Sequence, residues 1–344
     1  MRNKFIIIMT AIVLPFILSG CVKEEKQSKP LSRTEIFMGT AIKITLYNGG
    51  SDKILDKAFN RVVEIENLVS INKDGTEIDK LNENAGISSV KVSDTSYDII
   101  DKGLYYSELS KGKYDLTVGP LVKLWSIGLP EAKVPTNKEI NEIIKNIDYS
   151  KVKMNPETKE VFLTEKNMML DLGSIAKGYA TDEIVNILKK EGVEQAIVNL
   201  GGNIYAMGLK NGTSNWKIGI QNPFDERGSI VGSIEVTDKS VVTSGVYERF
   251  IEKDSIKYHH ILSPKTGYPY ETEIAGVSII ADKSIDADAL STLVFTEGLK
   301  EGIELVNNLD GVDAIFITSN KKVYMTDGLK ESFEMKNKEF VLSN

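Results

Sequence analysis

An acidic residue and a hydroxyl residue stand four positions apart in the segment DADALST, residues 286–292. On a helix, Asp288 and Thr292 would project from the same face, because positions i and i+4 are neighbours on the helix surface. Their carboxylate and hydroxyl oxygens are hard ligands that suit Mg²⁺, which also leaves room for phosphate oxygens. A solvated polar helix face would carry the same two residues, so the pair alone leaves both interpretations open.

A glycine-containing segment, DLGSIAKGYATD (residues 171–182), combines a carboxylate, a lysine and two glycines. We expect Asp171 at the end of a strand and Lys177 in the first turn of the helix that follows. Gly173 and Gly178 would allow a ligand to approach the backbone closely, and free amide groups at a helix start favour anions. The alternative is an ordinary strand-to-helix turn with a solvated lysine.

The two histidines of the chain are adjacent, His259 and His260 in YHHILSPKTGYP (residues 258–269). Neighbouring side chains on a strand point to opposite faces, so one histidine would face inward and the other outward. Histidine exchanges a proton near neutral pH, which suits it to a catalytic site. Chance placement on a strand accounts for the pattern equally well.

Several familiar catalytic patterns are missing from the sequence. It contains no G-x-x-x-x-G-K-[ST] phosphate loop, no G-x-G-x-x-G and no G-x-S-x-G nucleophile elbow. Two adjacent histidines and a single cysteine are a poor ligand set for zinc. The formal net charge of -7 argues against nucleic acid as a partner, because phosphate binding needs a basic face.

The N-terminus has the pattern of an export and anchoring segment. A basic start is followed by the apolar run Phe5–Leu18, which has the length of a secretory signal and is short for a membrane span. LSGC then ends at Cys21, the only cysteine, and resembles the lipobox of bacterial lipoproteins. We predict a lipoprotein signal peptide over residues 1–20, lipidation of Cys21 and a polar tether over residues 21–33. The alternative is an ordinary signal peptide with a chance cysteine.

From these features we expect the protein to lie outside the cytoplasm, anchored to the cell membrane through its lipid. A lone cysteine excludes internal disulfides, so the exported fold must depend on its core and its ligands. We expect one globular domain over residues 34–344, because a hydrophobic content of 41% and a charged content of 26% are ordinary for such proteins.

Hydrophobic periodicity predicts the main elements of this domain. Apolar residues recur at helical spacing in residues 52–70, 96–110, 137–147 and 174–192, and further helices are expected around Asp288 and from about Leu299. Residues 161–173 predict a β-hairpin, and many short alternating segments predict strands. Strands in runs, with helices grouped between them, indicate an α+β fold with mixed or antiparallel sheets flanked by helices.

Seven motifs occur together in an order that resembles the FAD:protein FMN transferase (ApbE) family. They are MGT (38–40), GKYDLTVGPLVKLW (112–125), DLGSIAKGYATD (171–182), VNLGGNIYAMG (198–208), VTSGVYERF (242–250), HHILSPKTGYP (259–269) and DADALST (286–292). The resemblance extends over about residues 34–328 and implies an ApbE-like fold related to the T-fold.

The same resemblance implies an activity. Members cleave FAD in the presence of Mg²⁺ and transfer its FMN half to a threonine hydroxyl of an acceptor flavoprotein, with release of AMP. The implied partners are extracytoplasmic flavoproteins with an exposed threonine motif, for example subunits of redox pumps or extracellular electron-transfer proteins. An attacking hydroxyl that belongs to the partner would explain why the chain has no nucleophile elbow of its own.

The matching motif positions imply roles for individual residues. Implied contacts to FAD are Met38, Lys113, Tyr114, Asp115, Asp171, Lys177 and Leu262. Implied metal ligands are Asp288, Thr292, the backbone carbonyl of Ser174, and Ser291, where the family often has an acidic residue instead. His260 is implied beside the pyrophosphate, which leaves His259 as a packing or surface residue. The proton of the acceptor threonine would pass to either Asp288 or His260.

Asn72 is a further expected contact to FAD, and it departs from the family, which commonly carries an aromatic residue there. An aromatic side chain would cover a ring of the dinucleotide and exclude water, whereas asparagine covers less and holds water. The departure favours a second candidate activity, an FAD pyrophosphatase that releases FMN and AMP. A non-catalytic flavin-binding lipoprotein is the third candidate, although a pure binder needs no metal-binding pair such as Asp288 and Thr292.

Overall fold

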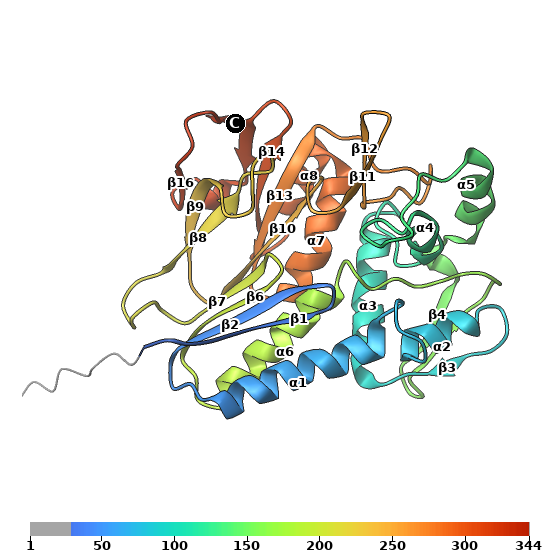
Figure 1. The fold of residues 1–344 in the computed structure, drawn as a ribbon, viewed down its shortest axis with the longest axis horizontal. Coiled ribbons are helices and arrows are strands. Elements are labelled where there is room, and N and C mark those ends of the chain that lie inside the picture. The colour runs from blue at the N-terminus through green and yellow to red at the C-terminus, as the bar shows by residue number, and fades with distance from the viewer. Residues whose placement is uncertain (1–28, 344) are drawn as a thin grey trace, which may run out of the picture.

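A nine-stranded sheet forms the centre of the computed structural model, which describes residues 29–343 (Figure 1). The strand order is β1-β2-β6-β7-β10-β13-β14-β15-β17, and only the β15–β17 pair is parallel. The bounds are β1 Leu31–Phe37, β2 Thr40–Asn48, β6 Gln195–Leu200, β7 Asn203–Met207, β10 Lys239–Gly245, β13 Ile274–Ala281, β14 Asp313–Thr318, β15 Lys322–Met325 and β17 Val341–Leu342.

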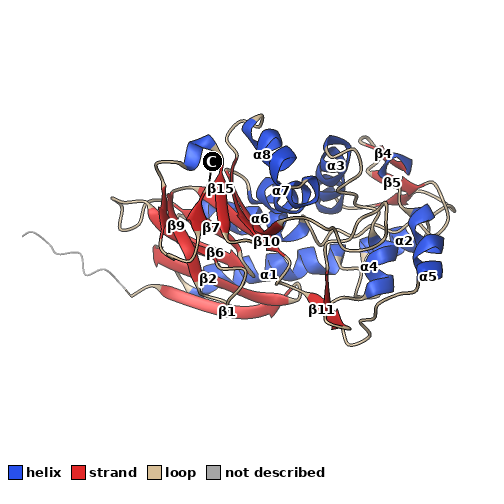
Figure 2. Ribbon diagram, turned by 90° about the horizontal axis from the view of Figure 1, so that it is seen from above, coloured by secondary structure: helices blue, strands red, loops and turns tan. Residues whose placement is uncertain are grey.

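Different layers cover the two faces of this sheet (Figure 2). One layer contains the helices α1 (Asp52–Val69), α6 (Ala176–Lys190), α7 (Ser284–Glu297) and α8 (Leu299–Asn307). The other is a three-stranded sheet of order β16-β9-β8, formed by Phe333–Met335, Ile230–Val236 and Trp216–Gln221. The α+β prediction with flanking helices is therefore confirmed.

Strand β14 shows why the sequences of the central strands are continuously apolar: its side chains alternate between two buried faces of the sheet. Ala314 and Phe316 belong to the helix-side core, whereas Ile315 and Ile317 belong to the core beneath the small sheet. Successive residues of a strand point to opposite faces, so both sets must be apolar when both faces are covered.

The second group of elements follows α1 in the chain and lies beside the main sheet (Figure 1). It contains α2 (Glu77–Glu83), α3 (Asp94–Leu109), α4 (Gly119–Trp125), α5 (Asn137–Ile143) and a small sheet of order β3-β5-β4. The strands of that sheet are β3 (Val90–Lys91), β4 (Val152–Asn155) and β5 (Glu160–Leu163). A separate hairpin, β11 (Phe250–Lys253) with β12 (Ile256–His259), carries the first of the two histidines.

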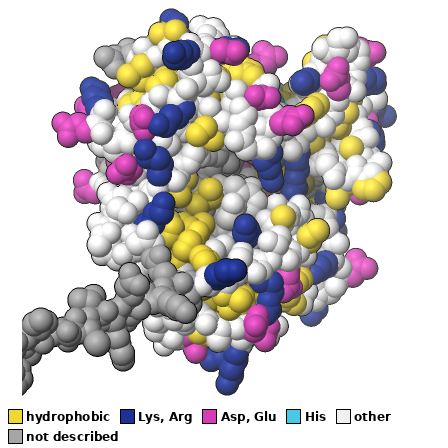
Figure 3. Space-filling model, turned by 60° about the vertical axis from the view of Figure 1, so that its left-hand side comes forward, with side chains coloured by type: hydrophobic (Ala, Val, Ile, Leu, Met, Phe, Trp, Pro, Cys, Tyr) yellow, Lys and Arg dark blue, Asp and Glu magenta, His cyan; other side chains and the backbone are white. Residues whose placement is uncertain are grey.

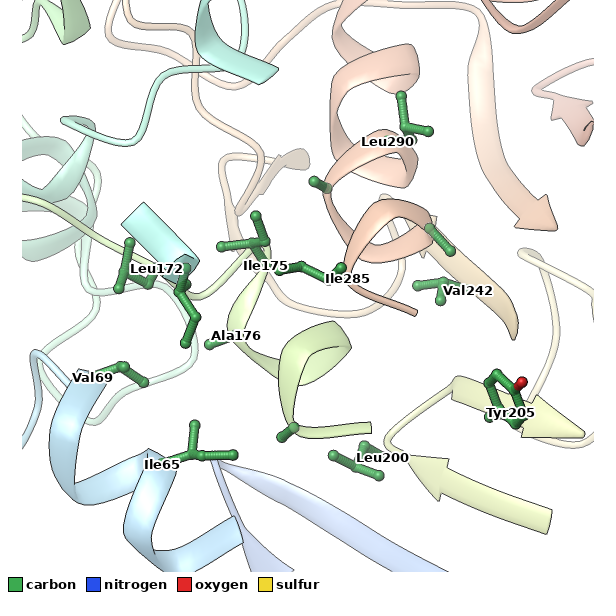
Figure 4. Packing of buried hydrophobic residues seen from close by; sticks show 14 of the residues in the cluster. Ile65, Val69, Leu172, Ile175, Ala176, Leu200, Tyr205, Val242, Ile285 and Leu290 are labelled. Atoms are coloured by element: carbon green, nitrogen blue, oxygen red, sulfur yellow. The ribbon is translucent and has the colours of Figure 1, made fainter. Parts of the chain in front are cut away.

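Helix α1 illustrates how the local sequence builds this packing. The Ser51 side chain accepts a hydrogen bond from the Ile54 amide and caps the helix start. Leu55, Phe59 and Val62 recur at three- and four-residue spacing and are buried. Figure 4 shows side chains from the end of α1, the start of α6 and α7 converging in the same core. This core fixes the positions of α6 and α7, which carry Lys177 and Asp288.

The predicted helices over residues 52–70, 96–110 and 174–192 are confirmed as α1, α3 and α6. The helix predicted over residues 137–147 is divided into α5 and a short 3₁₀ turn, Ile144–Asn146.

The predicted β-hairpin over residues 161–173 is wrong. Strand β5 pairs with β4, which precedes it, and with β3, so its hairpin partner lies on the N-terminal side. After β5 the chain turns at Asn167, whose φ is 66°, and Met169 forms only an isolated bridge with Val118. Asp171 therefore follows a single bridge residue rather than the end of a strand.

The folded domain begins before the predicted boundary at residue 34. Strand β1 starts at Leu31, which pairs with Leu46 of β2, so the end of the predicted tether is part of the sheet. The predicted signal peptide, Cys21 and most of the tether lie outside the described residues. Within residues 29–343, no helix has the length and apolar character needed to cross a membrane.

The molecular surface in Figure 3 carries charges of both signs. Lys and Arg side chains are interspersed with Asp and Glu side chains on this face, and hydrophobic side chains gather in a hollow near its centre.

Candidate active site

Most of the site residues predicted from the sequence line one cavity, whose volume is about 670 Å³. Its volume lies within the usual range of small-molecule sites. The predicted site residues that line it are Met38, Asn72, Lys113, Tyr114, Asp115, Asp171, Ser174, Lys177, His260, Leu262, Asp288 and Thr292. These residues come from segments far apart in the chain, so the fold brings the motifs together at one place.

Asp288 lies on the cavity wall where α6 and α7 meet. Its side chain is almost fully buried, and Oδ1 lies 3.1 Å from Lys177 Nζ while Oδ2 accepts a 2.8 Å hydrogen bond from the Gly178 amide. Burial raises the pKa of Asp288, and the Lys177 charge opposes that rise. A Cβ on residue 178 would lie 2.7 Å from Asp288 Cβ, so glycine is required for this close approach of the two helices.

Two further residues with hard oxygen donors line the same cavity as Asp288. Thr292 follows one turn later on α7 and also lines the cavity, as does Ser174 just before α6. A carboxylate, a hydroxyl and a carbonyl suit a divalent cation that keeps positions free for phosphate oxygens, so this donor set fits Mg²⁺. A cation on Asp288 would compete with Lys177 for the carboxylate, because Nζ already contacts Oδ1. Within residues 29–343, no group of three His, Cys, Asp or Glu side chains is arranged to hold a metal.

Ser291 does not join this set. Its side chain is fully buried, and it is not among the residues that line the cavity. The hydroxyl donates to the Asp288 carbonyl at 2.8 Å and lies 2.7 Å from the Ser244 hydroxyl on β10. The structure therefore gives no support to the sequence-based assignment of Ser291 as a metal ligand, because its hydroxyl is buried outside the cavity lining and is hydrogen-bonded within the protein.

Three predicted FAD contacts, Lys113, Tyr114 and Asp115, lie side by side but hold different partners. Lys113 Nζ pairs with Glu297 at 2.6 Å, and the Tyr114 hydroxyl accepts a 2.9 Å hydrogen bond from Ser174 Oγ. Asp115 accepts hydrogen bonds from the amide and hydroxyl of Thr117, both at 2.7 Å. The Asp115 carboxylate thus orders the turn that precedes α4, and its oxygens are engaged by groups of the protein itself.

The two histidines separate as the strand pattern predicts. His259 is buried, its Nε2 bonds to the Tyr270 carbonyl at 2.9 Å, and its ring packs edge-on against Phe295. His260 lines the cavity, and its Nδ1 lies 3.3 Å from the carbonyl oxygen of Arg249.

The Arg249 carbonyl also defines the protonation of His260. A carbonyl oxygen only accepts hydrogen bonds, so Nδ1 carries the proton in this contact and Nε2 keeps its lone pair. Burial, with the nearby Arg249 cation, lowers the pKa of His260 to about 4. The imidazole is therefore neutral at physiological pH, with a proton-accepting nitrogen available at the cavity.

The turn between β1 and β2 forms one edge of the cavity. Met38 and Gly39 both adopt positive φ, 52° and 69°, as the central residues of tight hairpin turns do. The Met38 amide donates to Glu66 Oε1 at 2.9 Å, and Glu66 Oε2 pairs with Lys73 at 2.8 Å. Sequence reasoning missed Glu66, since its role depends on the packing of α1 beside the turn.

Asn72 lies at the cavity beside a lysine that the sequence analysis did not assign. Lys123 Nζ donates to the Ile71 carbonyl at 2.6 Å and to Asn72 Oδ1 at 3.2 Å. Burial raises the pKa of Asp171, whereas the charges of Lys123, Arg249 and Lys177 oppose that rise. Lys123 and Arg249 belong to the segments GPLVKLW and VYERF, but nothing in their spacing predicts that they contact a ligand.

Comparison with known proteins agrees with this arrangement. The ApbE family model matches residues 38–316. The FAD:protein FMN transferase of Treponema pallidum (strain Nichols) is 36% identical over 330 residues, with 90% of this chain and 91% of that protein covered. The FAD:protein FMN transferase of Klebsiella pneumoniae (strain 342) is 34% identical, with 86% and 91% covered.

Solved structures show the same fold. The ApbE protein of Thermotoga maritima superimposes with a TM-score of 0.81 at 29% identity, covering 88% of this chain and 99% of that chain. The flavin transferase ApbE of Vibrio cholerae gives a TM-score of 0.79 at 25% identity, with 88% and 99% covered. Family model, relatives and fold agree over the segments that form the cavity, and the chain belongs to the ApbE family.

Proposed function

We propose that this protein is an FAD:protein FMN transferase that moves FMN from FAD to a threonine hydroxyl of an acceptor flavoprotein and releases AMP. The observation that carries the proposal is the convergence of Asp288, Lys177 and His260 on one cavity. The cavity combines an anionic metal-binding group, cations for phosphate and a neutral proton acceptor. The names of the curated relatives support the same activity.

In the proposed reaction the threonine oxygen attacks the phosphorus of the FMN half. The bond between that phosphorus and the bridging oxygen breaks, and the bridging oxygen leaves with its electron pair as part of AMP. The threonine proton passes to Nε2 of His260 or to a carboxylate oxygen of Asp288, and both groups line the cavity. The protein contributes position and charge rather than a covalent nucleophile, as is usual for phosphoryl transfer.

Asp288, Thr292 and the Ser174 carbonyl are the proposed Mg²⁺ ligands. When bound there, Mg²⁺ would neutralise charge on the pyrophosphate oxygens. Lys177, relieved of part of its pairing with Asp288, would face the same phosphates from the first turn of α6. A protein that only stores flavin has no use for this cluster, which argues against a non-catalytic binding role.

The direct experiment incubates the purified domain with FAD, MgCl₂ and an acceptor flavoprotein that bears an exposed threonine. The expected products are AMP and a covalently flavinylated acceptor, seen by chromatography and by in-gel flavin fluorescence. Replacement of the acceptor threonine by valine is the control and should abolish labelling. If AMP and free FMN form with acceptor present and no labelled acceptor appears, the transferase assignment is wrong.

An FAD pyrophosphatase activity is the second candidate, and Asn72 favours it. The side chain is polar, exposed and bonded to Lys123 at the cavity, so it can hold water near the bound dinucleotide. The same experiment separates the two activities, because hydrolysis yields FMN and AMP in equal amounts without acceptor.

We further propose that the protein acts outside the cytoplasm as a lipoprotein anchored through Cys21. The support is the sequence pattern, a basic start, an apolar run and LSGC, with no other cysteine in the chain. Detergent phase partitioning of the wild type and of Cys21→Ser tests the anchor. Equal partitioning of both into the aqueous phase would contradict it.

A further inference from the structure

Arg249 occupies a position that two glycines keep open. It lies between β10 and β11, lines the cavity, and passes between the Met38–Gly39 turn and the loop after α4. A Cβ on Gly39 would come within 3.3 Å of Arg249 Nη2, and a Cβ on Gly128 within 3.1 Å of Arg249 Cδ. Both glycines adopt positive φ, which disfavours other residues at these positions, so the space beside the arginine stays free of side chains.

The guanidinium of Arg249 forms no salt bridge with a carboxylate among residues 29–343, and it acts on buried Asp171 only through its charge, which opposes the raised pKa of that group. Its one direct hydrogen bond reaches the Gly39 carbonyl from Nη2 at 3.4 Å. The neighbouring acid Glu248 is paired with Arg227 at 2.9 Å and is not available. A guanidinium has five N–H donors in a planar fork, so most of the donors of Arg249 remain free for a ligand.

The other cations of the cavity are mostly compensated. Lys73, Lys113 and Lys177 pair with Glu66, Glu297 and Asp288 at 2.8, 2.6 and 3.1 Å. Lys123 has no carboxylate partner in the described part of the chain, but its ammonium already donates to two oxygens of the 71–72 loop. Arg249 is thus the cavity cation with the largest unused capacity to bind an anion.

The main chain of Arg249 also connects it to the catalytic histidine. The Arg249 carbonyl accepts from the His260 amide at 3.1 Å and contacts His260 Nδ1 at 3.3 Å. The backbone of Arg249 therefore holds His260, the residue proposed as one possible acceptor of the threonine proton. The side chains of both residues line the same cavity, and the Arg249 charge contributes to the lowered pKa of His260, so a phosphate held by the guanidinium would share the cavity with the His260 ring.

We propose that Arg249 is a phosphate-positioning residue, whose guanidinium binds the pyrophosphate oxygens of FAD and fixes the reacting phosphorus relative to His260. This inference rests on the proposed function for the identity of the ligand. Arginine matches two oxygens of a phosphate at once, which a lysine ammonium does not do. The role concerns binding and orientation, and the proton transfer remains with His260 or Asp288.

The experiment compares Arg249→Gln, Arg249→Lys and the matched control Lys253→Gln, which removes one positive charge from exposed β11 outside the cavity. Binding of FAD and of riboflavin, which has no phosphate, is measured by flavin fluorescence at low and high salt, with melting temperature as a folding check. Arg249→Gln should weaken FAD binding by about tenfold or more and leave riboflavin binding within about twofold. Arg249→Lys should recover part of the loss, and Lys253→Gln should match the wild type.

Unchanged FAD binding in Arg249→Gln overturns the inference, as does an equal loss for FAD and riboflavin, which would make the residue structural. Loss of FAD binding in Lys253→Gln as large as in Arg249→Gln would show a general charge effect instead. The inference and the proposed function fail separately. A wild type that binds FAD through Arg249 but labels no acceptor keeps the phosphate role and loses the transferase assignment.

Discussion

Lys177 Nζ lies 3.1 Å from Asp288 Oδ1, and this pair joins the first turn of α6 to the first half of α7. Asp288 is 3% exposed, so its charge is compensated by Lys177 and the Gly178 amide rather than by water. The pair is a stabilising contact in the free protein and the proposed metal site in the working enzyme. Changing its two members in turn therefore tests both the proposed metal site and the contribution of the pair to stability.

Removal of the Asp288 charge should abolish catalysis and preserve the fold. Asp288→Asn keeps the side-chain volume but deletes the carboxylate proposed to hold Mg²⁺, which should slow AMP release by about a hundredfold or more. Asp286→Asn is the control, because Asp286 lies on the same helix, pairs with Lys102 and does not line the cavity. AMP formation with MgCl₂ and with EDTA measures the effect. Near-normal turnover by Asp288→Asn would show that the metal site is misplaced.

Removal of Lys177 should instead reduce stability. Lys177→Met leaves the Asp288 carboxylate buried without its cation, and we expect a loss of about 2 kcal/mol, moderated because Lys177 is partly exposed. MgCl₂ should restore part of the loss, since a ligand that binds the native state stabilises it. The double variant Lys177→Met/Asp288→Asn should be more stable than Lys177→Met alone and should not respond to MgCl₂. Urea unfolding with and without the salt decides between these results.

The depressed pKa of His260 should be visible in the pH dependence of stability. The unfolded imidazole takes up a proton near pH 6.5, whereas the native group, lowered mainly by burial, does so near pH 4. Between these values the unfolded state binds more protons, so the free energy of unfolding falls as the pH falls. His260→Gln should show a shallower fall of the melting temperature between pH 6.5 and 4.5. An identical slope in both proteins would contradict the assigned environment of His260.

The sequence predicted the parts of this site that depend on local spacing. Asp288 and Thr292 share a helix face because they are four residues apart, and both line the cavity. Lys177 lies in the first turn of α6 as the glycine-containing segment indicated. In each case short-range geometry sets the direction of the side chain. The identity of the ligand, FAD, was predicted from the family resemblance.

The features that escaped prediction depend on contacts between distant segments. Ser291 has the right spacing for a ligand, but its hydroxyl is bonded to Ser244 on a strand 47 residues earlier in the chain. Asp115 was predicted to contact FAD because it lies in one of the motifs, yet its carboxylate oxygens accept hydrogen bonds from the Thr117 and Tyr149 amides. Arg249 forms no salt bridge because Glu248, the acid next to it in the chain, is paired with Arg227 in the folded protein. No local period of the sequence contains such information.

The last prediction concerns Asn72 and the fate of water in the cavity. Asn72 is a polar side chain that accepts a hydrogen bond from Lys123 at the cavity, so we expect water near the bound FAD to be able to attack the same phosphorus as threonine. Without acceptor, the wild type should hydrolyse FAD slowly to FMN and AMP. Asn72→Tyr should suppress this hydrolysis by displacing water, with transfer to an acceptor retained or improved, because a docked hydroxyl has the higher effective concentration.

Asn72→Ala separates the two properties of the side chain, since it removes the amide without filling the space. It should hydrolyse FAD at least as fast as the wild type, because the gap beside the dinucleotide grows and remains wet. Chromatography of FAD, FMN and AMP over time, with and without acceptor, measures both reactions for the three proteins. Hydrolysis of FAD by Asn72→Tyr at the wild-type rate would mean that the side chain at position 72 does not control the access of water to the bound FAD.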